Sequence, residues 1–427
     1  AGEWNGGAGF DPVGQSNSTV ETPFTGSFDG QGHQIDGLWI DRPDRSGVGL
    51  FGETEDVLIQ NVTVTDARIS GDNGAGTLVG AQRGGTVMDA DAVNVDVDGG
   101  SETGGLVGSS LDAEISDSYA NGNVSGAWST GGLVGFSYGD VTDSAADADV
   151  IGATAGGLVG MSEGGSITES HAAGDVLSDG IGGGLVGESA VGVIERSSAN
   201  GTVESDVAGG LVGENNGGEL IESVAEGSSV SGSTSGGLAG SNDGLIVDSY
   251  ATVDVDTWDD GTAGGVVGEN TGDVVRTYAV GSVAPSAVSG GLVGQNGRVD
   301  SRGSYNGSVE TSAWDVNATG QDEALGEIGS DGSVIADDVA GLTTEQITGA
   351  TAAEFELFAS QDTWKTTDEY PALWWQDVDE MDDAPSEDEY VDLLDGMDGT
   401  GTEADPYVIT DVYELQAMAG VRAAGGR

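Results

Sequence analysis

The stretch GGLVGFSYGDVTDSAADADVIGATAGGLVG, from Gly131 to Gly160, contains one complete repeat of the chain and the start of the next. The same five opening residues, or a close variant, recur along most of the sequence. They begin at Gly76, Gly104, Gly131, Gly156, Gly183, Gly209, Gly236, Gly264 and Gly290, and a degenerate copy begins at Val48. Successive copies start 25 to 28 residues apart. A period of this length predicts a repeat architecture.

Each GGLVG motif is followed by a short alternating segment. Examples are GSITESHAAGDV from Gly165 and GVIERSSANGTV from Gly192. An Ile or Val precedes a Ser or Thr by three positions, and Ala follows two positions later. Alternation of β-branched residues between glycine turns indicates short strands. A unit this small cannot bury its own apolar face, but stacked units bury a continuous one.

We therefore predict an all-β fold, a right-handed parallel β-helix (β-solenoid) of about 10–12 coils whose equivalent strands lie about 4.8 Å apart. A β-propeller fits less well, because its blades need about 40 residues or more. We expect the glycine pair at a corner where a side chain would crowd the next coil. Two interior ladders are expected, one of leucines and one of Ile and Val, formed by Leu106, Leu133, Leu158, Leu185, Leu211 and Leu292 and by Ile115, Val141, Ile167 and Ile194.

The composition is that of a protein built for concentrated salt. Of the 427 residues 74 are acidic and 11 basic, which gives a net charge of −63. Molar salt shortens the screening length to about 3 Å and suppresses this repulsion. Nucleic acid is an implausible partner for so acidic a chain, and no apolar run is long enough for membrane insertion. The absence of cysteine excludes disulfides, zinc-thiolate sites and thiol nucleophiles.

The repeats resemble those of GLUG-motif proteins, named for Gly-Leu-(variable)-Gly. The resemblance covers Val48 to about Val309 and extends to the flanks, where FTGSFDGQGHQIDGL (Phe24–Leu38) is similar to a first coil. GLTTEQITG (Gly341–Gly349) and YPALWWQ (Tyr370–Gln376) are similar to a closing segment. The resemblance implies a secreted or surface-attached, adhesin-like protein of bacteria or archaea. It implies no enzyme activity and supplies no catalytic residues.

The sequence divides into five expected parts. Residues 1–47 form a first coil and cap, 48–320 the repeat solenoid, and 321–376 a small C-terminal cap. Residues 377–400 are an acidic linker. Residues 401–427 read as a strand followed by an amphipathic helix, which Asp411 and Glu414 would cap. Such a segment cannot form a core alone.

In relatives of this kind, a segment like 401–427 precedes the first coil rather than following the last one. Three arrangements remain open. The segment caps the first coil of a neighbouring subunit, begins the next module of a longer surface protein, or folds back on its own first coil. The first arrangement is a head-to-tail contact that builds filaments. Its junction candidates are Tyr407, Ile409, Tyr413, Leu415 and Met418 on one side and Trp4, Phe10, Phe24 and Phe28 on the other.

A search for catalytic groups finds no matched set. The two histidines are His33, in a turn of the first coil, and His171, which occupies the position that holds Tyr119, Tyr250 or Tyr278 in other coils. Arginines are sparse in the repeats and do not recur beside a carboxylate cluster. A polysaccharide-degrading β-helix enzyme is therefore the least favoured class, and we expect no catalysis and no organic cofactor. The aromatic residues near both ends are more typical of hydrophobic plugs than of a carbohydrate platform.

Two kinds of surface site remain possible on the sequence. The segments Asp89–Gly100 and Asp395–Asp405 could bind Ca²⁺ or other cations, without a specific calcium motif. N-glycosylation sequons occur at Asn17, Asn61, Asn123, Asn200, Asn306 and Asn317. We therefore expect an extracellular structural glycoprotein of a halophilic archaeon, a head-to-tail homopolymer such as a pilus-like filament. The alternative is an adhesin module that binds surface glycans, neighbouring cells or other filaments.

Overall fold

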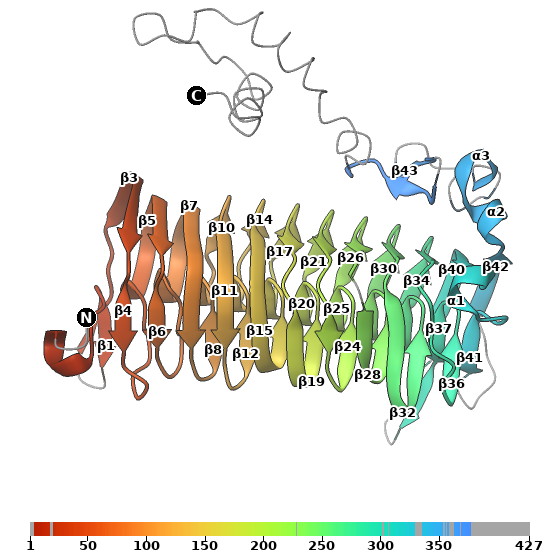
Figure 1. Ribbon diagram of the computed structural model, residues 1–427, viewed down its shortest axis with the longest axis horizontal. Coiled ribbons are helices and arrows are strands. Elements are labelled where there is room, and N and C mark those ends of the chain that lie inside the picture. Colours follow the sequence, from red (N-terminus) through yellow and green to blue (C-terminus); the bar gives the residue numbers. More distant parts are fainter. Residues whose placement is uncertain are drawn as a thin grey trace, which may run out of the picture. The chain divides into compact units, whose positions relative to one another are not determined.

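The computed structural model describes residues 4–17, 20–227, 229–300, 303–305, 307–328, 335–352, 355, 357, 363–367 and 369–376. The chain forms two compact units, Ala1–Pro371 and Ala372–Arg427. The first unit is a parallel β-solenoid of about eleven coils, as the repeat predicts. Among the described residues, thirty-eight strands belong to one continuous hydrogen-bonded sheet. Figure 1 shows the coils following one another along one axis, from β3 at one end to β42 at the other.

Equivalent strands of successive coils pair in parallel and form the walls of the solenoid. From the motif at Gly104 to that at Gly290, the strand after GGLVG is β9 (Val107–Leu111), β13 (Val134–Ser137), β16 (Val159–Ser162), β20 (Val186–Ser189), β25 (Val212–Asn215), β29 (Ala239–Asn242), β33 (Val267–Asn270) and β37 (Val293–Asn296). β41 (Leu325–Ile328) continues this column beside β37. The Ile/Val strand is β10 (Glu114–Ser116), β14 (Val141–Thr142), β17 (Ser166–Thr168), β21 (Val193–Glu195), β26 (Glu219–Ile221), β30 (Leu245–Val247) and β34 (Asp273–Val275). The strand that carries the recurrent alanine is β11 (Tyr119–Ser125), β18 (His171–Ala172), β22 (Ser198–Ala199), β27 (Val224–Ala225), β31 (Tyr250–Ala251) and β35 (Tyr278–Ala279).

The remaining strands lead back to the next motif or continue around a corner. The short ones are β4 (Trp39–Asp41), β6 (Arg68–Ser70), β8 (Glu102–Gly104), β12 (Ser129–Gly131), β23 (Val203–Glu204), β24 (Val207–Gly209) and β36 (Val288–Gly290). The long ones are β3 (Ser27–Asp36), β5 (Phe51–Thr65), β7 (Val79–Asp98), β15 (Ala145–Gly156), β19 (Val176–Gly183), β28 (Ser229–Gly236), β32 (Asp254–Gly264), β40 (Ser308–Asp315) and β42 (Ile335–Leu342).

Outside the walls lie two antiparallel hairpins and a few short elements. The hairpins are β1 (Gln15–Asn17) with β2 (Val20–Thr22), and β38 (Arg298–Asp300) with β39 (Gly303–Tyr305). The other elements are the 3₁₀ helix η1 (Trp4–Gly7), the helices α1 (Val316–Thr319), α2 (Thr344–Ile347) and α3 (Gly349–Ala352), and the strands β43 (Trp364–Lys365) and β44 (Ala372–Leu373). None of the helices in the described part of the chain is long and apolar enough to cross a membrane.

Both predicted interior ladders are present. The six predicted leucines are fully buried, and their backbones are bonded in series, as in Leu106 N–H to Leu133 O at 3.0 Å. Ile115 pairs in register with Val141, Val141 with Ile167, and Ile167 with Ile194. The sequence period therefore predicts the core correctly at the level of individual residues.

The glycine pair lies where the backbone has no room for a side chain. A Cβ at Gly132 would lie 2.0 Å from the carbonyl oxygen of Gly157 and 2.9 Å from Cβ of Ala146. The recurrent alanine therefore faces the second glycine of the motif across a thin part of the interior. The alanine column ends at Trp314, which pairs with Ala279 and fills the interior in the last coils.

A column of hydroxyl groups forms the turn before the alanine. Ser144 Oγ donates to Thr142 O at 2.7 Å and accepts the N–H of Ser118 at 3.2 Å, and the pattern repeats in the following coils. The residue before each serine has a left-handed backbone, for example Asp143 with φ 46° and Glu169 with φ 50°. Acidic residues dominate this position, which places a ladder of charges along one corner.

A second polar column lies at another corner of the solenoid and consists of buried asparagines. Asn215 donates to Asn242 at 2.8 Å, Asn242 to Asn270 at 2.9 Å, and Asn270 to Asn296 at 2.9 Å. All four side chains are nearly inaccessible. The same column holds Ser137, Ser162 and Ser189 in earlier coils. Sequence reasoning missed this ladder, although Asn recurs two residues after the last glycine of four successive motifs.

Candidate functional surfaces

The first coil presents an open strand edge. β3 pairs in parallel with β5, and among the described residues no strand pairs with its other side. Figure 1 shows β3 as the outermost long strand at the N-terminal end of the solenoid. A row of unpaired backbone N–H and C=O groups at such an edge is a template for another strand.

Two of the predicted junction residues come together at this end. Phe24 and Phe28 both pack on Phe51, with ring centroids 4.9 Å and 5.3 Å apart. Phe24 and Phe28 remain half-buried, whereas Phe51 belongs to the core. An aromatic cluster of this kind ends the apolar interior without closing it completely.

The N-terminal segment covers a different part of the same end. Its backbone runs beside β4, where Phe10 N–H donates to Trp39 O at 2.8 Å. Asp11 forms ion pairs with Arg42 at 3.2 Å and Arg45 at 3.0 Å. Phe10 is half-buried against the core, and Trp4 lies in η1. Tyr407, Ile409, Tyr413, Leu415 and Met418, like the ranges 377–400 and 401–427, lie outside the described residues.

A side wall of the solenoid is covered by the chain that follows the last coil. Tyr250 and Tyr278 stack with centroids 4.7 Å apart and planes only 4° apart. The Trp364 ring lies 5.6 Å from Tyr278 and 6.1 Å from Tyr250. Tyr278 donates its hydroxyl to Pro371 O, and burial raises the pKa of this hydroxyl well above its ordinary value. Trp364 therefore covers a side wall, although it is one of the aromatic residues near the C-terminal end that the sequence suggested as hydrophobic plugs.

Asp315 anchors the same returning segment. Tyr370 donates its hydroxyl to Asp315 Oδ2 at 2.9 Å. Partial burial, together with this carboxylate, raises the pKa of Tyr370 to about 12. The other carboxylate oxygen of Asp315 accepts the N–H groups of Asn317 and Ala318 and caps α1. This buried carboxylate thus joins the last coil, α1 and the returning chain.

The histidines occupy structural or exposed positions. His171 lies in the outward column between Ala145 and Ser198, as the repeat predicts. Its Nδ1 lies 2.9 Å from Ser198 Oγ, and burial lowers its pKa, which favours the neutral ring. His33 is exposed on β3. The described residues contain no cluster of three His, Asp or Glu side chains that could hold a metal ion.

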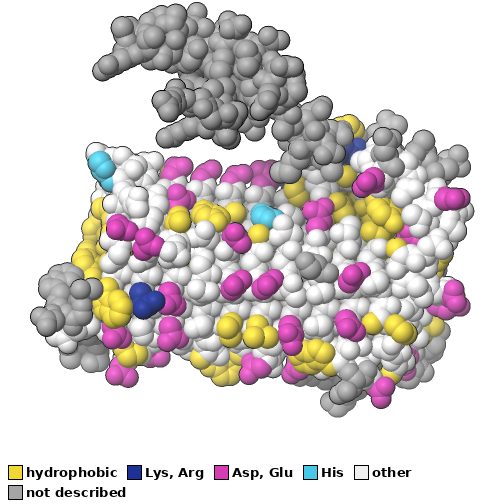
Figure 2. All heavy atoms as spheres, in the orientation of Figure 1, with side chains coloured by type: hydrophobic (Ala, Val, Ile, Leu, Met, Phe, Trp, Pro, Cys, Tyr) yellow, Lys and Arg dark blue, Asp and Glu magenta, His cyan; other side chains and the backbone are white. Residues whose placement is uncertain are grey.

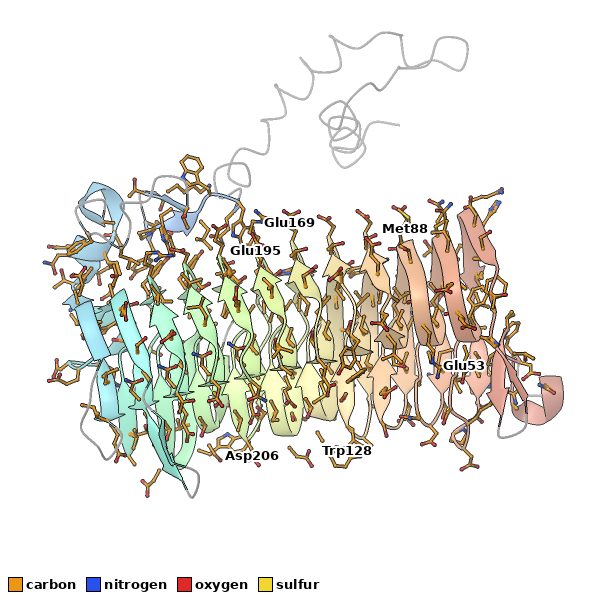
Figure 3. The ribbon with its side chains drawn as sticks, turned by 180° about the vertical axis from the view of Figure 1, so that it is seen from behind. Glu53, Met88, Trp128, Glu169, Glu195 and Asp206 are labelled. Atoms are coloured by element: carbon orange, nitrogen blue, oxygen red, sulfur yellow. The ribbon has the colours of Figure 1, made fainter. Side chains whose placement is uncertain are left out.

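Four arginines of the repeats form ion pairs with nearby acids: Arg68, Arg83, Arg196 and Arg276. Arg276 forms a two-pronged contact with Asp248, with Nε to Oδ1 at 2.7 Å. Arg196 pairs with Glu169 at 3.3 Å and Glu195 at 3.4 Å. Figure 3 shows Glu169 and Glu195 close together at one edge of the solenoid. The pairs Arg276–Asp248 and Arg196–Glu169 join neighbouring coils, whereas Arg196–Glu195 lies within one coil.

The acidic segment Asp89–Gly100 lies mainly on β7. Thr63 donates to Asp91 at 3.3 Å, and burial raises the pKa of Asp91. Asp96 pairs with Arg68 at 3.0 Å. Figure 2 shows that acidic side chains are spread across the visible face of the solenoid, with few basic ones between them. The second predicted cation segment, Asp395–Asp405, lies outside the described residues.

The sequons differ in accessibility. Asn123, Asn200 and Asn317 are exposed, although Asn317 Oδ1 accepts the N–H of Thr344 at 3.1 Å. Asn61 is half-buried and donates to Asp29 at 3.1 Å. Asn17 lies in β1, and Asn306 lies outside the described residues. Glycosylation therefore stays a prediction, with Asn123 and Asn200 as its best-placed acceptors.

An apolar surface strip was not anticipated from the sequence. Trp128 is 65% exposed, Ile151 53% and Leu177 47%. The three residues belong to neighbouring coils of a chain that is otherwise strongly acidic. A signal existed in the sequence, because Ile151 and Leu177 each follow a valine that belongs to the buried phase of the alternation and so fall in its outward phase. The sequence alone does not show that these three side chains lie together, because that depends on which coils are neighbours and on which segments cover the wall.

The comparisons with known proteins agree with this architecture. Residues 99–125 and 126–151 match the GLUG motif, so the chain contains GLUG repeats, as its resemblance implies. Halomucin of Haloquadratum walsbyi is 40% identical over 123 residues, which is 28% of this chain and 1% of Halomucin. A protein described as a Gly-rich membrane protein of Evansella cellulosilytica is 36% identical over 93 residues, which is 22% of this chain and 10% of that protein. No solved structure matches.

The chain thus spans a small part of each relative. Their similarity indicates a cell-surface protein, and the relative from Haloquadratum agrees with the composition expected for a halophile. Neither relative is described as an enzyme.

Proposed function

We propose that this protein is a non-catalytic structural subunit of an extracellular filament on a halophilic archaeon, assembled head-to-tail. The open edge of β3 is the observation that carries the proposal. A strand added to this edge would satisfy backbone groups that water otherwise must satisfy. The half-buried Phe24 and Phe28 beside it would gain apolar contacts from the same partner.

The C-terminal sequence supplies a matching donor. PYVIT (Pro406–Thr410) has the alternation of a strand, and Tyr407 and Ile409 share one face of it. Tyr413, Leu415 and Met418 lie in the amphipathic segment that follows. Donation of this segment to the first coil of the next copy would be a heterologous contact, which propagates as a filament unless it closes into a ring.

Electron microscopy of the full chain in molar KCl tests the proposal. We expect threads whose axial repeat is close to one solenoid length. A variant that ends at Thr400 should give isolated rods, and Ile409→Lys should shorten the threads. Tyr138→Lys changes an exposed aromatic residue away from both ends and serves as the control. Isolated rods from the full chain at high protein concentration would overturn the proposal, as would threads from the shortened chain.

A second candidate function is that of an adhesin module. The exposed strip of Trp128, Ile151 and Leu177 favours it, because large apolar side chains on an acidic surface are typical of contact sites.

A further inference from the structure

One outward column of the solenoid changes from polar to apolar and back. Asp98 pairs in register with Ser125, Ser125 with Ile151, and Ile151 with Leu177. Leu177 is followed by Glu204 in the next coil. The apolar part is therefore two coils long and is bounded by Ser125 and Asp98 at one end and by Glu204 at the other.

Trp128 stands at the corner beside this column. Its backbone is held in place, since Trp128 O accepts the N–H of Thr154 at 3.0 Å. Its side chain is the second most exposed of the large hydrophobic residues in the described part of the chain. Figure 3 shows Trp128 at the same edge of the solenoid as Asp206, opposite the edge of Glu169.

Two hollows follow one another along this wall. One has a volume of about 480 Å³ and is lined by Ala127, Ile151, Ala153, Leu177 and Asp179, among others. The next has a volume of about 500 Å³, and Arg68, Asp96, Asp98 and Ser125 contribute to it. Both volumes fall within the range of about 300–1,000 Å³ found for small-molecule sites.

Charge and area limit what can occupy the strip. The net charge of −63 disfavours polyanions and acidic proteins. A second copy of this chain is disfavoured on area. Three half-exposed side chains offer on the order of 300 Å² of apolar surface. A stable interface needs about 800 Å² from each partner.

We propose that this strip binds an uncharged polysaccharide. The apolar face of a sugar ring would stack on Trp128 and pack against Ile151 and Leu177. Its hydroxyl groups would donate to the carboxylates of Asp98 and Asp179, which are exposed at the ends of the strip. The coils repeat about every 4.8 Å, close to the length of one sugar ring, so the polysaccharide runs along the solenoid. This binding site rests on the adhesin candidate proposed above and does not depend on filament assembly.

Retention on insoluble polysaccharides in molar KCl tests the inference. The probes are cellulose, amylose and mannan as uncharged chains, with alginate as the charged comparison. We expect the full chain to bind at least one uncharged probe and not alginate. Trp128→Ala and Ile151→Asp should weaken this binding at least tenfold. Tyr138→Ala, which removes an exposed aromatic ring elsewhere, should leave it unchanged.

Circular dichroism and the unfolding midpoint establish that each variant is folded. Failure to bind any of the three uncharged probes would overturn the inference, as would equal binding by Trp128→Ala. Sedimentation velocity tests the alternative that a second copy of the chain, rather than a polysaccharide, occupies the strip. If Trp128→Ala converts a dimer into a monomer, a second copy occupies the strip and the inference is wrong. Weaker polysaccharide binding by Trp128→Ala, with thread formation unchanged, would support the inference.

Discussion

Gly132 and Ala146 face each other across the interior so closely that a Cβ on the glycine would lie 2.9 Å from Cβ of the alanine. The contact recurs between Gly157 and Ala172 at the same distance. It connects two parts of the repeat, the second glycine of GGLVG and the alanine that follows the serine turn. The two features that recur in each repeat are therefore the two sides of one contact.

Replacing Gly132 with alanine should destabilise the solenoid by about 3 kcal/mol or more, because overpacking cannot be relieved without moving a neighbouring carbonyl group. Gly37→Ala is the control, since a Cβ there meets nothing within 4 Å but the backbone has φ +68°. That strain should cost about 1–2 kcal/mol. Chemical unfolding in molar KCl, followed by circular dichroism, measures both. Equal losses for the two variants would contradict the contact as the cause.

The repeated part of the fold could be predicted because each coil meets the same environment. Leu158, for example, lies between Leu133 of the preceding coil and Leu185 of the following coil. The spacing of the repeats alone therefore identifies the leucine ladder. The position of His171 in the tyrosine column followed from the same logic. Once the pairing of equivalent residues is known for two successive coils of a solenoid, the pairing in the other coils follows.

The surfaces could not be predicted in the same way. Trp364 is distant in sequence from Tyr250 and Tyr278, and nothing local indicates which wall the returning chain covers. Trp128 looks like an isolated aromatic residue until the coils place Ile151 and Leu177 beside it. The asparagine ladder was visible in the sequence, but each Asn alone resembles an ordinary turn residue.

Replacing Asn242 with leucine should cost about 3 kcal/mol. Its amide accepts an N–H of Asn215 and donates to Asn270 Oδ1. The change therefore removes the acceptor of one buried N–H of Asn215, whose amide nitrogen still donates to Gly218 O, and the donor to Asn270 Oδ1, and each loss is worth about 1–3 kcal/mol. Asn242→Ser should cost less, because serine occupies this column in other coils. The exposed Asn216→Ala should stay within about 0.5 kcal/mol of the parent. Comparable losses for Asn242→Leu and Asn216→Ala would show that the ladder contributes little.

Replacing Trp364 with alanine should release the returning segment from the side wall. Loss of a buried tryptophan costs about 3–5 kcal/mol. Burial is the main cause of the raised pKa of Tyr278, so this pKa should fall towards its ordinary value in the variant. Ultraviolet absorbance during an alkaline titration measures the change. The exposed Trp128→Ala should leave the titration as it is, and an unchanged titration in Trp364→Ala would refute the covering role.

Replacing Glu214 with glutamine should stabilise the protein at neutral pH. Burial is the largest cause of the raised pKa of Glu214, and the charges of Glu188, Asp243 and Glu269 add to it, while Asn216 opposes them. The folded state therefore binds the proton more tightly than the unfolded chain, and ionisation costs stability above the folded pKa. The cost fades as the pH falls through the folded pKa and is gone below the unfolded value of about 4.3.

The gain from Glu214→Gln should be about 0.2–1 kcal/mol, the range for like charges on adjacent strands. It should be larger in dilute salt, where the carboxylates are less screened. Unfolding midpoints from pH 4 to pH 8 measure it, and the parent and variant curves should converge at the acidic end. Glu219→Gln removes an equal charge from an exposed position and accounts for the general effect of lowering the net charge. If both variants gain equally at every pH, simple charge reduction explains the result and burial of Glu214 does not.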